Sequence, residues 1–303
     1  MKFRIFIAVA ISALFAFGTA FAQQPIVIKF SHVVALDTPK GKGAEQFKKL
    51  AEERTKGRVK VEVYPNSQLY KDGEEMEALQ LGSVQMLAPS VAKFGPLGVR
   101  EFEVFDLPYI FDSYSDLHKV TEGAVGKMLF AKLESKGITG LAYWDNGFKD
   151  FSANKALKVP ADVKGLKLRI QSSNVLEAEI RALGGIPQKM HEVQKYLTMT
   201  DHGVIEYAVI VNKKFWDGLP PDIRSALDSA MKDATKYAND IAKKENEDAL
   251  EGVKKSGKTQ IITLSPEEKA VWKKALLTVH KEQESRIGKD VIQAVYKDTG
   301  FKP

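Results

Sequence analysis

Residues 26–64 read IVIKFSHVVALDTPKGKGAEQFKKLAEERTKGRVKVEVY, and this stretch decides the fold. It begins with β-branched and apolar residues over 26–34, which predict a strand. Thr38 and Pro39 then predict the start of a helix, because threonine caps helices and proline fits their first turn. Apolar residues recur at helical spacing as far as Gly57, and residues 58–64 alternate valine with polar residues like a half-buried strand.

The pattern continues outward from this β-α-β unit. Residues 74–81 predict a second helix and residues 84–88 a third strand, so the first part of the chain is expected to form a parallel sheet with covering helices. A second α/β unit follows in the same way. Its predicted elements are a helix-rich stretch over 113–136, strands at 138–143, 165–171 and 206–212, and a helix over 174–183.

The last part of the chain is predicted to be mostly helical. One long amphipathic pattern covers residues 221–255, a short strand follows at 259–264, and Ser265 caps a final helix. No glycine- or serine-rich linker separates the two α/β units, so we expect a hinged two-lobe α/β protein. The predicted division is lobe I over 23–145, lobe II over 146–220, and a C-terminal part over 221–303 that packs on both lobes.

The N-terminus predicts a cleavable signal peptide over residues 1–22. Lys2 and Arg4 precede an apolar run over 5–17, and Ala20-Phe21-Ala22 has the small-x-small pattern of a cleavage site. A membrane anchor is the alternative, but the run is short for a bilayer span. Because the chain contains no cysteine, the lipoprotein route is closed, and we expect export to a Gram-negative periplasm.

The composition is that of an ordinary globular protein, with 44% hydrophobic and 28% charged residues in 303. The absence of cysteine excludes disulfides, thiol chemistry and cysteine-bound metals. The net charge is +6, but basic residues are interleaved with acidic ones, which is typical of solvated helices and not of a nucleic-acid surface. We therefore expect no nucleic-acid partner.

Motifs for catalysis are not found. None of the five histidines forms a metal-ligand pair on a helix face, and the sequence has no nucleophile elbow and no P-loop. Gly41-Lys42-Gly43 is predicted to be a solvated loop, and Asp201-His202 a polar turn in preference to part of a catalytic set. The sequence therefore predicts no catalytic residues, no metal and no cofactor, and an enzyme is the disfavoured reading.

Polar residues do gather at the carboxyl ends of predicted strands, where ligands bind in open α/β sheets. His32 and Val33 end the first strand, and Ser90 follows the third. Residues 146–149, which include Asn146 and Lys149, are predicted to follow the strand that ends at Tyr143.

Arg169 is the most informative of these residues. Alternation along its strand places Arg169 and Gln171 on one face, and a guanidinium facing a cleft suits bidentate pairing with a carboxylate. An edge strand with a solvated polar face is an equally good reading. Lys149 would bind a second anionic group or lie on the surface, and Trp144, Phe148 and Phe151 would line a pocket or belong to the core.

Several long motifs resemble one known family. They are IKFSH at 28–32, YPNSQLY at 64–70, YWDNGFK at 143–149, GLKLRIQSS at 165–173, HEVQKYL at 191–197 and VIVNKKFWDGLP at 209–220. In their order and context they are similar to the solute-binding subunits of tripartite ATP-independent periplasmic (TRAP) transporters, in particular the C4-dicarboxylate-binding type.

The resemblance implies two lobes that close on a small carboxylate and deliver it to a membrane permease driven by an ion gradient. It implies that Arg169 binds the ligand carboxylate, that Lys149 is a second basic contact, and that Val33 and Ser90 line the pocket. With the residues suggested by position alone, the predicted ligand-binding set is Arg169, Lys149, Ser90, Val33, His32, Gln171, Asn146 and Trp144.

The chain departs from the family pattern at one place. LGGIPQ at 183–188 runs directly into KMHEVQ at 189–194, whereas the family continues through a strand, a helix and another strand. We therefore expect the second lobe to lack at least a strand and a helix after Gln188. The expected consequences are an exposed sheet edge, lower stability and weak or absent ligand binding.

The leading prediction is a monomeric binding protein for a C4-dicarboxylate such as malate, succinate or fumarate. Three alternatives remain open from the sequence: a receptor for another organic acid, a ligand-presenting subunit of a membrane sensor, and a degenerate copy with impaired binding.

Overall fold

The structure is a computed structural model that describes residues 24–171, 173–188 and 194–303. The predicted signal peptide lies outside the described residues, and so do the first residues of the junction that follows Gln188.

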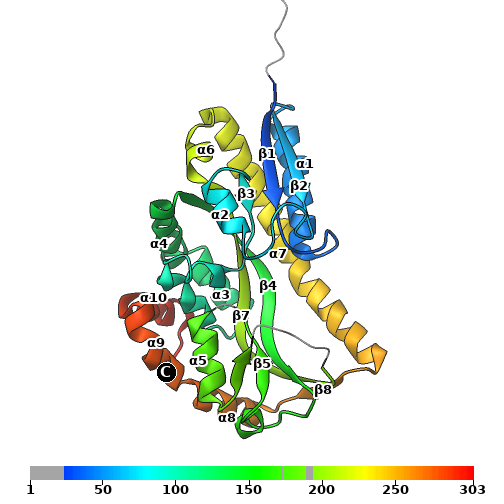
Figure 1. Cartoon of the computed structure of the whole chain (residues 1–303), viewed down its shortest axis with the longest axis vertical. Helices are drawn as coiled ribbons and strands as arrows, with labels where there is room; N and C mark the ends of the chain where they lie inside the picture. Colours follow the sequence, from blue (N-terminus) through cyan, green and yellow to red (C-terminus); the bar gives the residue numbers. More distant parts are fainter. Residues whose placement is uncertain (1–23, 172, 189–193) are drawn as a thin grey trace, which may run out of the picture.

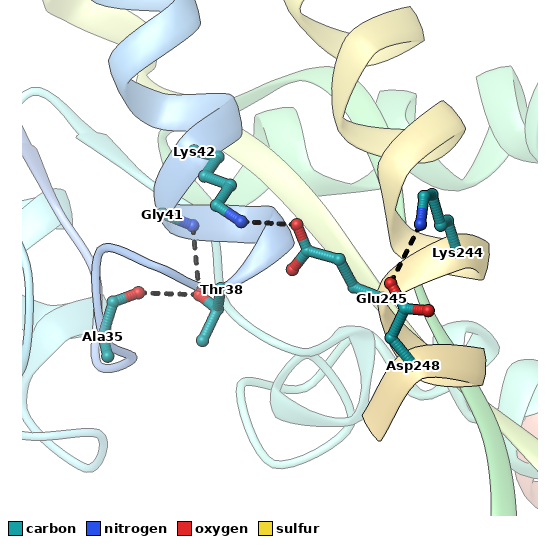
Figure 2. Close-up of polar contacts among 7 residues, drawn as sticks. All are labelled: Ala35, Thr38, Gly41, Lys42, Lys244, Glu245 and Asp248. Carbon is teal, nitrogen blue, oxygen red and sulfur yellow. Dashed lines mark hydrogen bonds and ion pairs between the residues drawn. The ribbon is translucent and has the colours of Figure 1, made fainter. Parts of the chain in front are cut away.

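The first lobe is built on three parallel strands, β1 (Ile26–Ser31), β2 (Val59–Tyr64) and β3 (Met86–Leu87), with β1 between the other two. Helix α1 (Pro39–Arg54) connects β1 to β2, and α2 (Glu75–Gln80) precedes β3. The predicted β-α-β-α-β order is confirmed. The predicted cap is confirmed as well, because the Thr38 hydroxyl accepts a hydrogen bond of 3.2 Å from the Gly41 N–H (Figure 2).

Two long antiparallel strands, β4 (Ile138–Ala153) and β7 (Tyr196–Asn212), run side by side through the middle of the molecule (Figure 1). They complete a sheet of order β2-β1-β3-β7-β4, and β8 (Gln260–Thr263) pairs with the opposite end of β7. Because β7 is antiparallel to β3, the sheet is mixed and not wholly parallel. Through these strands one sheet reaches both lobes.

The predicted strands over 138–143 and 206–212 are correct in place but too short. Residues 146–149, predicted to follow a strand, lie within β4, and Asp201-His202, predicted to be a turn, lies within β7. The pairing shifts register at Gly140/Ala142, Asp145/Gly147 and Lys149/Phe151, and Asp201 has a φ of +46°. The turn-like residues are thus accommodated as irregularities that bend the strands without ending them. The proposed lobe boundary between residues 145 and 146 falls at one of these shifts.

Helices cover both faces of the sheet. One face packs on α1 and the first half of α7 (Pro221–Ser256), around Phe30, Phe47 and Trp144. Figure 2 shows a contact between these two helices, an ion pair of 2.5 Å between Lys42 and Glu245. The elements against the other face are the 3₁₀ segments η1 (Val91–Lys93), η2 (Arg100–Asp106) and η3 (Glu134–Lys136) and the helices α3 (Tyr114–Thr121) and α4 (Ala124–Leu133).

The second lobe has little sheet of its own. It contains η4 (Pro160–Val163), β5 (Lys167–Arg169), α5 (Asn174–Ala182) and β6 (Ile186–Gln188). β5 and β6 form a separate parallel pair that is not hydrogen-bonded to the large sheet in the described residues. A small detached sheet is what a shortened second lobe would leave.

The C-terminal part contains the predicted long helix, α7, which follows α6 (Lys213–Asp217) and runs diagonally past both lobes (Figure 1). The prediction of a single final helix is wrong. Three helices follow β8, namely α8 (Pro266–Leu276), α9 (Thr278–Ile287) and α10 (Lys289–Thr299). Gly288, with a φ of +103°, separates the last two, and α9 and α10 pack on η2 and α3 of the first lobe.

Among the helices of the described chain, none combines the length and the apolar character that crossing a membrane requires.

Candidate functional site

A cavity of about 320 Å³ lies where β4 and β7 meet β5 and α5. Arg169, Gln171 and Lys149 all line it, so the structure brings together three of the residues selected from the sequence. The other lining residues are Phe148, Asp150, Phe151, Ile170, Leu176, Glu179, Ile180, Leu197, His202 and Ile205.

Arg169 stands at the end of β5. Alternation along this strand is confirmed, because Leu168 is buried whereas Lys167 and Arg169 are exposed. The strand combines the two alternatives, an edge strand and a strand that faces a cleft. In the described chain β5 pairs with β6 alone, and its polar face borders the cavity. Nearby, the Gln171 Oε1 is buried without a hydrogen-bond partner among the described residues. A ligand can therefore reach the Arg169 guanidinium, and the Gln171 Oε1 is available nearby as a hydrogen-bond acceptor.

Lys149 comes from the opposite wall, on β4. Its Nζ lies 2.7 Å from the Asp106 Oδ1, and the two side chains are 10% and 2% exposed. A buried lysine needs such a partner, because an isolated buried charge is very costly. The prediction of a plain surface lysine is therefore wrong, and Lys149 reaches the cavity as one half of an ion pair.

Three further polar groups of the cavity were missed from the sequence, namely His202, Glu179 and Asp150. The His202 ring stacks on Phe151 with 3.9 Å between centroids, and its Nδ1 lies 2.9 Å from the Thr200 hydroxyl. Burial lowers the pKa of His202 to about 3, so the imidazole is neutral at physiological pH. Burial raises the pKa of Glu179 well above its usual range, and that of Asp150 to about 6.

A signal for Glu179 was present in the sequence. It falls on the same helical face as Leu176, Ile180 and Leu183, at spacings of three and four residues, so it interrupts an apolar stripe. The sequence contains no comparable signal for His202, because this residue is buried only if β7 continues through Asp201-His202, which has the composition of a turn.

The other predicted site residues lie outside this cavity. Ser90 caps η1 and forms a β-bridge with Tyr207, whose hydroxyl accepts a hydrogen bond of 2.7 Å from Asn146 Nδ2. His32 is 1% exposed, and burial lowers its pKa to about 4. Val33 is half-buried just after β1. His32, Val33 and Ser90 follow strands of the first lobe, whereas Asn146 lies within β4.

Trp144 belongs to the core and not to the cavity. Its side chain is fully buried, lies beside Phe30 and donates a hydrogen bond of 2.9 Å from Nε1 to the Thr235 hydroxyl on α7. Its position as a wall of the Arg169 site is therefore not supported by the structure.

Two larger cavities have different linings. One of about 400 Å³ lies between the last turns of α7 and strands β4 and β7, and it shares Phe148 and Asp150 with the site. One of about 600 Å³ lies between α7, α3 and α4 and contains neither Arg169 nor Lys149. We place the site in the smallest of these three because Arg169, Lys149 and Gln171, all selected from the sequence, line it. In the described residues no group of three histidine or acidic side chains is arranged to hold a metal ion.

Comparison with known proteins gives a consistent family. Residues 30–190 and 187–286 match the model of the bacterial extracellular solute-binding proteins, family 7. The C4-dicarboxylate-binding periplasmic protein DctP of Rhodobacter capsulatus is 60% identical, with 90% of each chain covered. The C4-dicarboxylate-binding protein DctB of Bacillus subtilis is 39% identical, with 89% of this chain and 86% of the relative covered.

Solved structures agree. A TRAP periplasmic solute-binding protein of Shewanella oneidensis with bound succinate has a TM-score of 0.87 and 37% identity, covering 91% of this chain and 99% of the other. One from Pseudomonas aeruginosa with bound L-malate has a TM-score of 0.83 and 41% identity, covering 85% of this chain and all of the other. The two-lobe fold is therefore confirmed.

The same comparisons are consistent with a shortened chain. The Rhodobacter alignment spans 301 positions but includes 90% of the 303 residues, about 273, which leaves about 28 positions without a residue here. The two family matches meet at residues 187–190, where the sequence predicts the missing block.

Proposed function

The chain belongs to family 7 of the bacterial extracellular solute-binding proteins, and from this premise we propose that it binds a C4-dicarboxylate at the Arg169–Lys149 cavity. The convergence of these two cations on one cavity is the observation that carries the proposal. Relatives named for C4-dicarboxylate binding, and solved neighbours with succinate and L-malate, support it. The family is one of solute-binding proteins and not a class of enzymes.

The geometry suits a short diacid. The exposed guanidinium of Arg169 offers paired N–H donors to one carboxylate, and the Lys149 ammonium offers a point charge to the other. The cavity is at the small end of the range of about 300–1,000 Å³ found for ligand sites, and it has an apolar lining between the two cations. Succinate, malate and fumarate share this pattern of two anionic ends and a short carbon chain.

The role we propose is delivery of the ligand to the membrane subunits of a TRAP transporter from the periplasm, after removal of residues 1–22. The protein would act as a monomer with lobes over 23–145 and 146–220 and a C-terminal part over 221–303. The register shifts in β4 and β7 would supply the hinge, because irregular strands bend more easily than regular ones. Closure would bring His32, Val33 and Ser90 of the first lobe, and Asn146 at the lobe boundary, toward the ligand.

Titration calorimetry of the purified mature protein with succinate, L-malate and fumarate tests this proposal. Arg169→Ala should weaken binding of the preferred acid by about 10- to 100-fold, because a charge-assisted hydrogen bond is worth about 1.5–3 kcal/mol. Arg181→Ala is the matched control, since Arg181 is an exposed arginine on α5 paired with Glu177 at 2.8 Å. Unchanged affinity in the Arg169 variant would refute the site.

The shortened second lobe makes a further difference measurable. We expect the affinity to be lower than that of the Rhodobacter capsulatus relative in the same buffer if, as the sequence predicts, the block after Gln188 that would supply one wall of the site is missing. A folded protein that binds none of the three acids would favour a degenerate copy instead.

A further inference from the structure

The site contains a buried acid that the dicarboxylate proposal does not use. Glu179 projects from α5 into the lining of the cavity, and its side chain is 1% exposed. Its Oε1 has no hydrogen-bond partner among the described residues. A buried carboxyl group without a partner is energetically costly, so packing alone does not explain a glutamate at this position.

The groups around Glu179 come from several elements. Lys149 of β4 and Asp106 at the end of η2 are its nearest charged neighbours, and Asp106 leaves its Oδ2 without a partner among the described residues. His202 of β7 and Arg169 of β5 line the same cavity, together with Asp150. Tyr109, whose hydroxyl is buried and equally unpartnered, donates its N–H to the His202 carbonyl oxygen at 2.9 Å.

Several charged or polar groups on the helices that pack against α5 are already engaged. On α9, Arg286 pairs with Glu103, and His280 bonds to the Pro108 carbonyl oxygen at 2.7 Å. On α8, Lys269 pairs with Asp201. None of these groups provides Glu179 with a positive partner of its own among the described residues.

The charges of Lys149 and Asp106 decide whether a ligand carboxylate can bind beside the neutral or the ionised form of Glu179. The positive charge of Lys149 is already balanced by Asp106 at 2.7 Å. With Glu179 neutral, this end of the cavity has no net charge, and with Glu179 ionised it is negative. A ligand carboxylate arriving there would meet a like charge in a poorly solvated place, where repulsion between charges is much stronger than in water.

We propose that Glu179 enters the complex as a neutral carboxylic acid and donates a hydrogen bond to the ligand carboxylate at Lys149, so that one proton is bound together with the dicarboxylate. The inference rests on the proposed function and adds a residue that determines how the second carboxylate is recognised. Burial, which raises the pKa of Glu179 well above its usual range, agrees with the neutral form. Below the pKa of Glu179 in the free protein this proton is already in place, and above it one proton is taken up from the solvent when the dicarboxylate binds. In the complex the proton lies between the two carboxyl oxygens.

The test compares the dissociation constant of succinate for three proteins between pH 5.5 and 9.5. The wild type should lose affinity as pH rises through the pKa of Glu179 in the free protein, by up to about tenfold per pH unit. Glu179→Gln keeps a neutral donor of the same shape, so it should bind like the wild type at pH 5.5 and stay level as the pH rises. Glu179→Leu keeps the volume but removes the donor, so it should bind at least about tenfold more weakly at pH 5.5.

Two outcomes overturn the inference. One is equal affinity of the Glu179→Leu variant and the wild type at pH 5.5, which would mean that no donor is needed. The other is a parallel loss of affinity in the wild type and in Glu179→Gln as the pH rises. Comparing these two proteins at each pH cancels the contributions of other titrating groups, and their melting temperatures show whether both are folded.

The experiment also separates this inference from the proposed function. If the wild type binds succinate and Arg169→Ala does not, the dicarboxylate site stands whatever the Glu179 variants do. If the folded wild type binds no dicarboxylate at any pH, both proposals fail together.

Discussion

The two lobes are held together in different ways. In the first, β1 is hydrogen-bonded to β2 on one side and β3 on the other, and β3 continues into β7 of the large sheet. In the second, β5 and β6 pair only with each other in the described chain. Phe30, Phe47 and Trp144, which are among the largest fully buried side chains, lie in the first lobe. Cavities border both lobes, but the one lined by Arg169 reaches β5 and α5 of the second.

This difference indicates where the protein is vulnerable. Backbone hydrogen bonds and two packed faces stabilise the first lobe, while side-chain packing of α5 on α8 and α9 has to stabilise the second. Cooperative units with few buried contacts open first. The proposed binding site therefore lies on the side of the molecule that we expect to open first, and among the described residues it is lined by β4 and β7 of the large sheet.

The largest effect should come from truncating the two cores. Phe30→Ala removes a fully buried ring of the first lobe and should lower the free energy of unfolding by about 3–5 kcal/mol. Leu168→Ala, in β5, should cost about 2 kcal/mol, because this side chain is slightly exposed and its strand borders a cavity. Urea unfolding measures both, and a greater loss for Leu168→Ala would contradict the comparison.

A second test compares a buried ion pair at the site with an exposed pair far from it. Lys149→Met leaves Asp106 buried without its cation and should cost about 3 kcal/mol or more. Arg54→Met removes an α1–α7 pair with Asp233, whose side chains are 27% and 55% exposed, and should cost at most about 1 kcal/mol. Equal losses in urea unfolding would show that Lys149 is not a buried charge.

How much of the fold the sequence predicts depends on whether the signals are local. β1, α1 and β2 were predicted almost to the residue because caps, proline and alternation are read within a few residues. β4 and β7 were cut short because Asp145-Asn146-Gly147 and Asp201-His202 have the composition of turns. They remain in strands because each strand pairs with the other, a partner about sixty residues away in sequence.

The site residues, too, were predicted where the sequence signal is local and missed where it depends on distant contacts. Arg169 and Gln171 were placed on one face by alternation, and the resemblance to a family pointed to Lys149. The ion partner of Lys149 could not be predicted, since Asp106 lies in a 3₁₀ segment with no sequence signature. Trp144 was predicted as an aromatic wall and is core, because the side of the strand on which it falls depends on the register shift at Gly140/Ala142.

Acidification should affect a buried histidine in each lobe with the same sign. Burial lowers the pKa of His202 to about 3 and that of His32 to about 4, so both folded states favour the neutral ring. Their contribution to stability is complete above about pH 6.5 and is lost as the pH falls toward those values, by at most about 1.4 kcal/mol per pH unit for each. His202→Gln and His32→Gln should each flatten the dependence of the unfolding free energy on pH.

The two variants also report on the lobes separately. If the second lobe opens first in acid, His202→Gln will change the first transition seen by circular dichroism, and His32→Gln will change only the last. His118 is the control of opposite sign, because its hydrogen bond to Asp145 raises its pKa. A single transition shifted alike by both variants would show that the lobes unfold as one unit.

The smallest effects are expected at two helix caps, one on each side of the molecule. The Thr38 hydroxyl caps α1, which packs on the sheet beside α7 in the first lobe (Figure 2). Ser265 caps α8 in a capping box with Glu268, and α8 packs on η4 of the second lobe. Thr38→Ala and Ser265→Ala each remove one acceptor for a helix N–H, which costs about 1 kcal/mol.

The two lobes are distinguished by whether this loss of about 1 kcal/mol appears in the global free energy of unfolding or only in local opening. Since α1 is part of the main core, Thr38→Ala should lower the global free energy of unfolding by the full amount. If α8 opens locally before the rest, Ser265→Ala should leave the global value almost unchanged and instead speed hydrogen exchange of the α8 amides by about fivefold. Equal global losses in both variants would mean that the second lobe is as cooperative as the first, despite its detached β5–β6 pair.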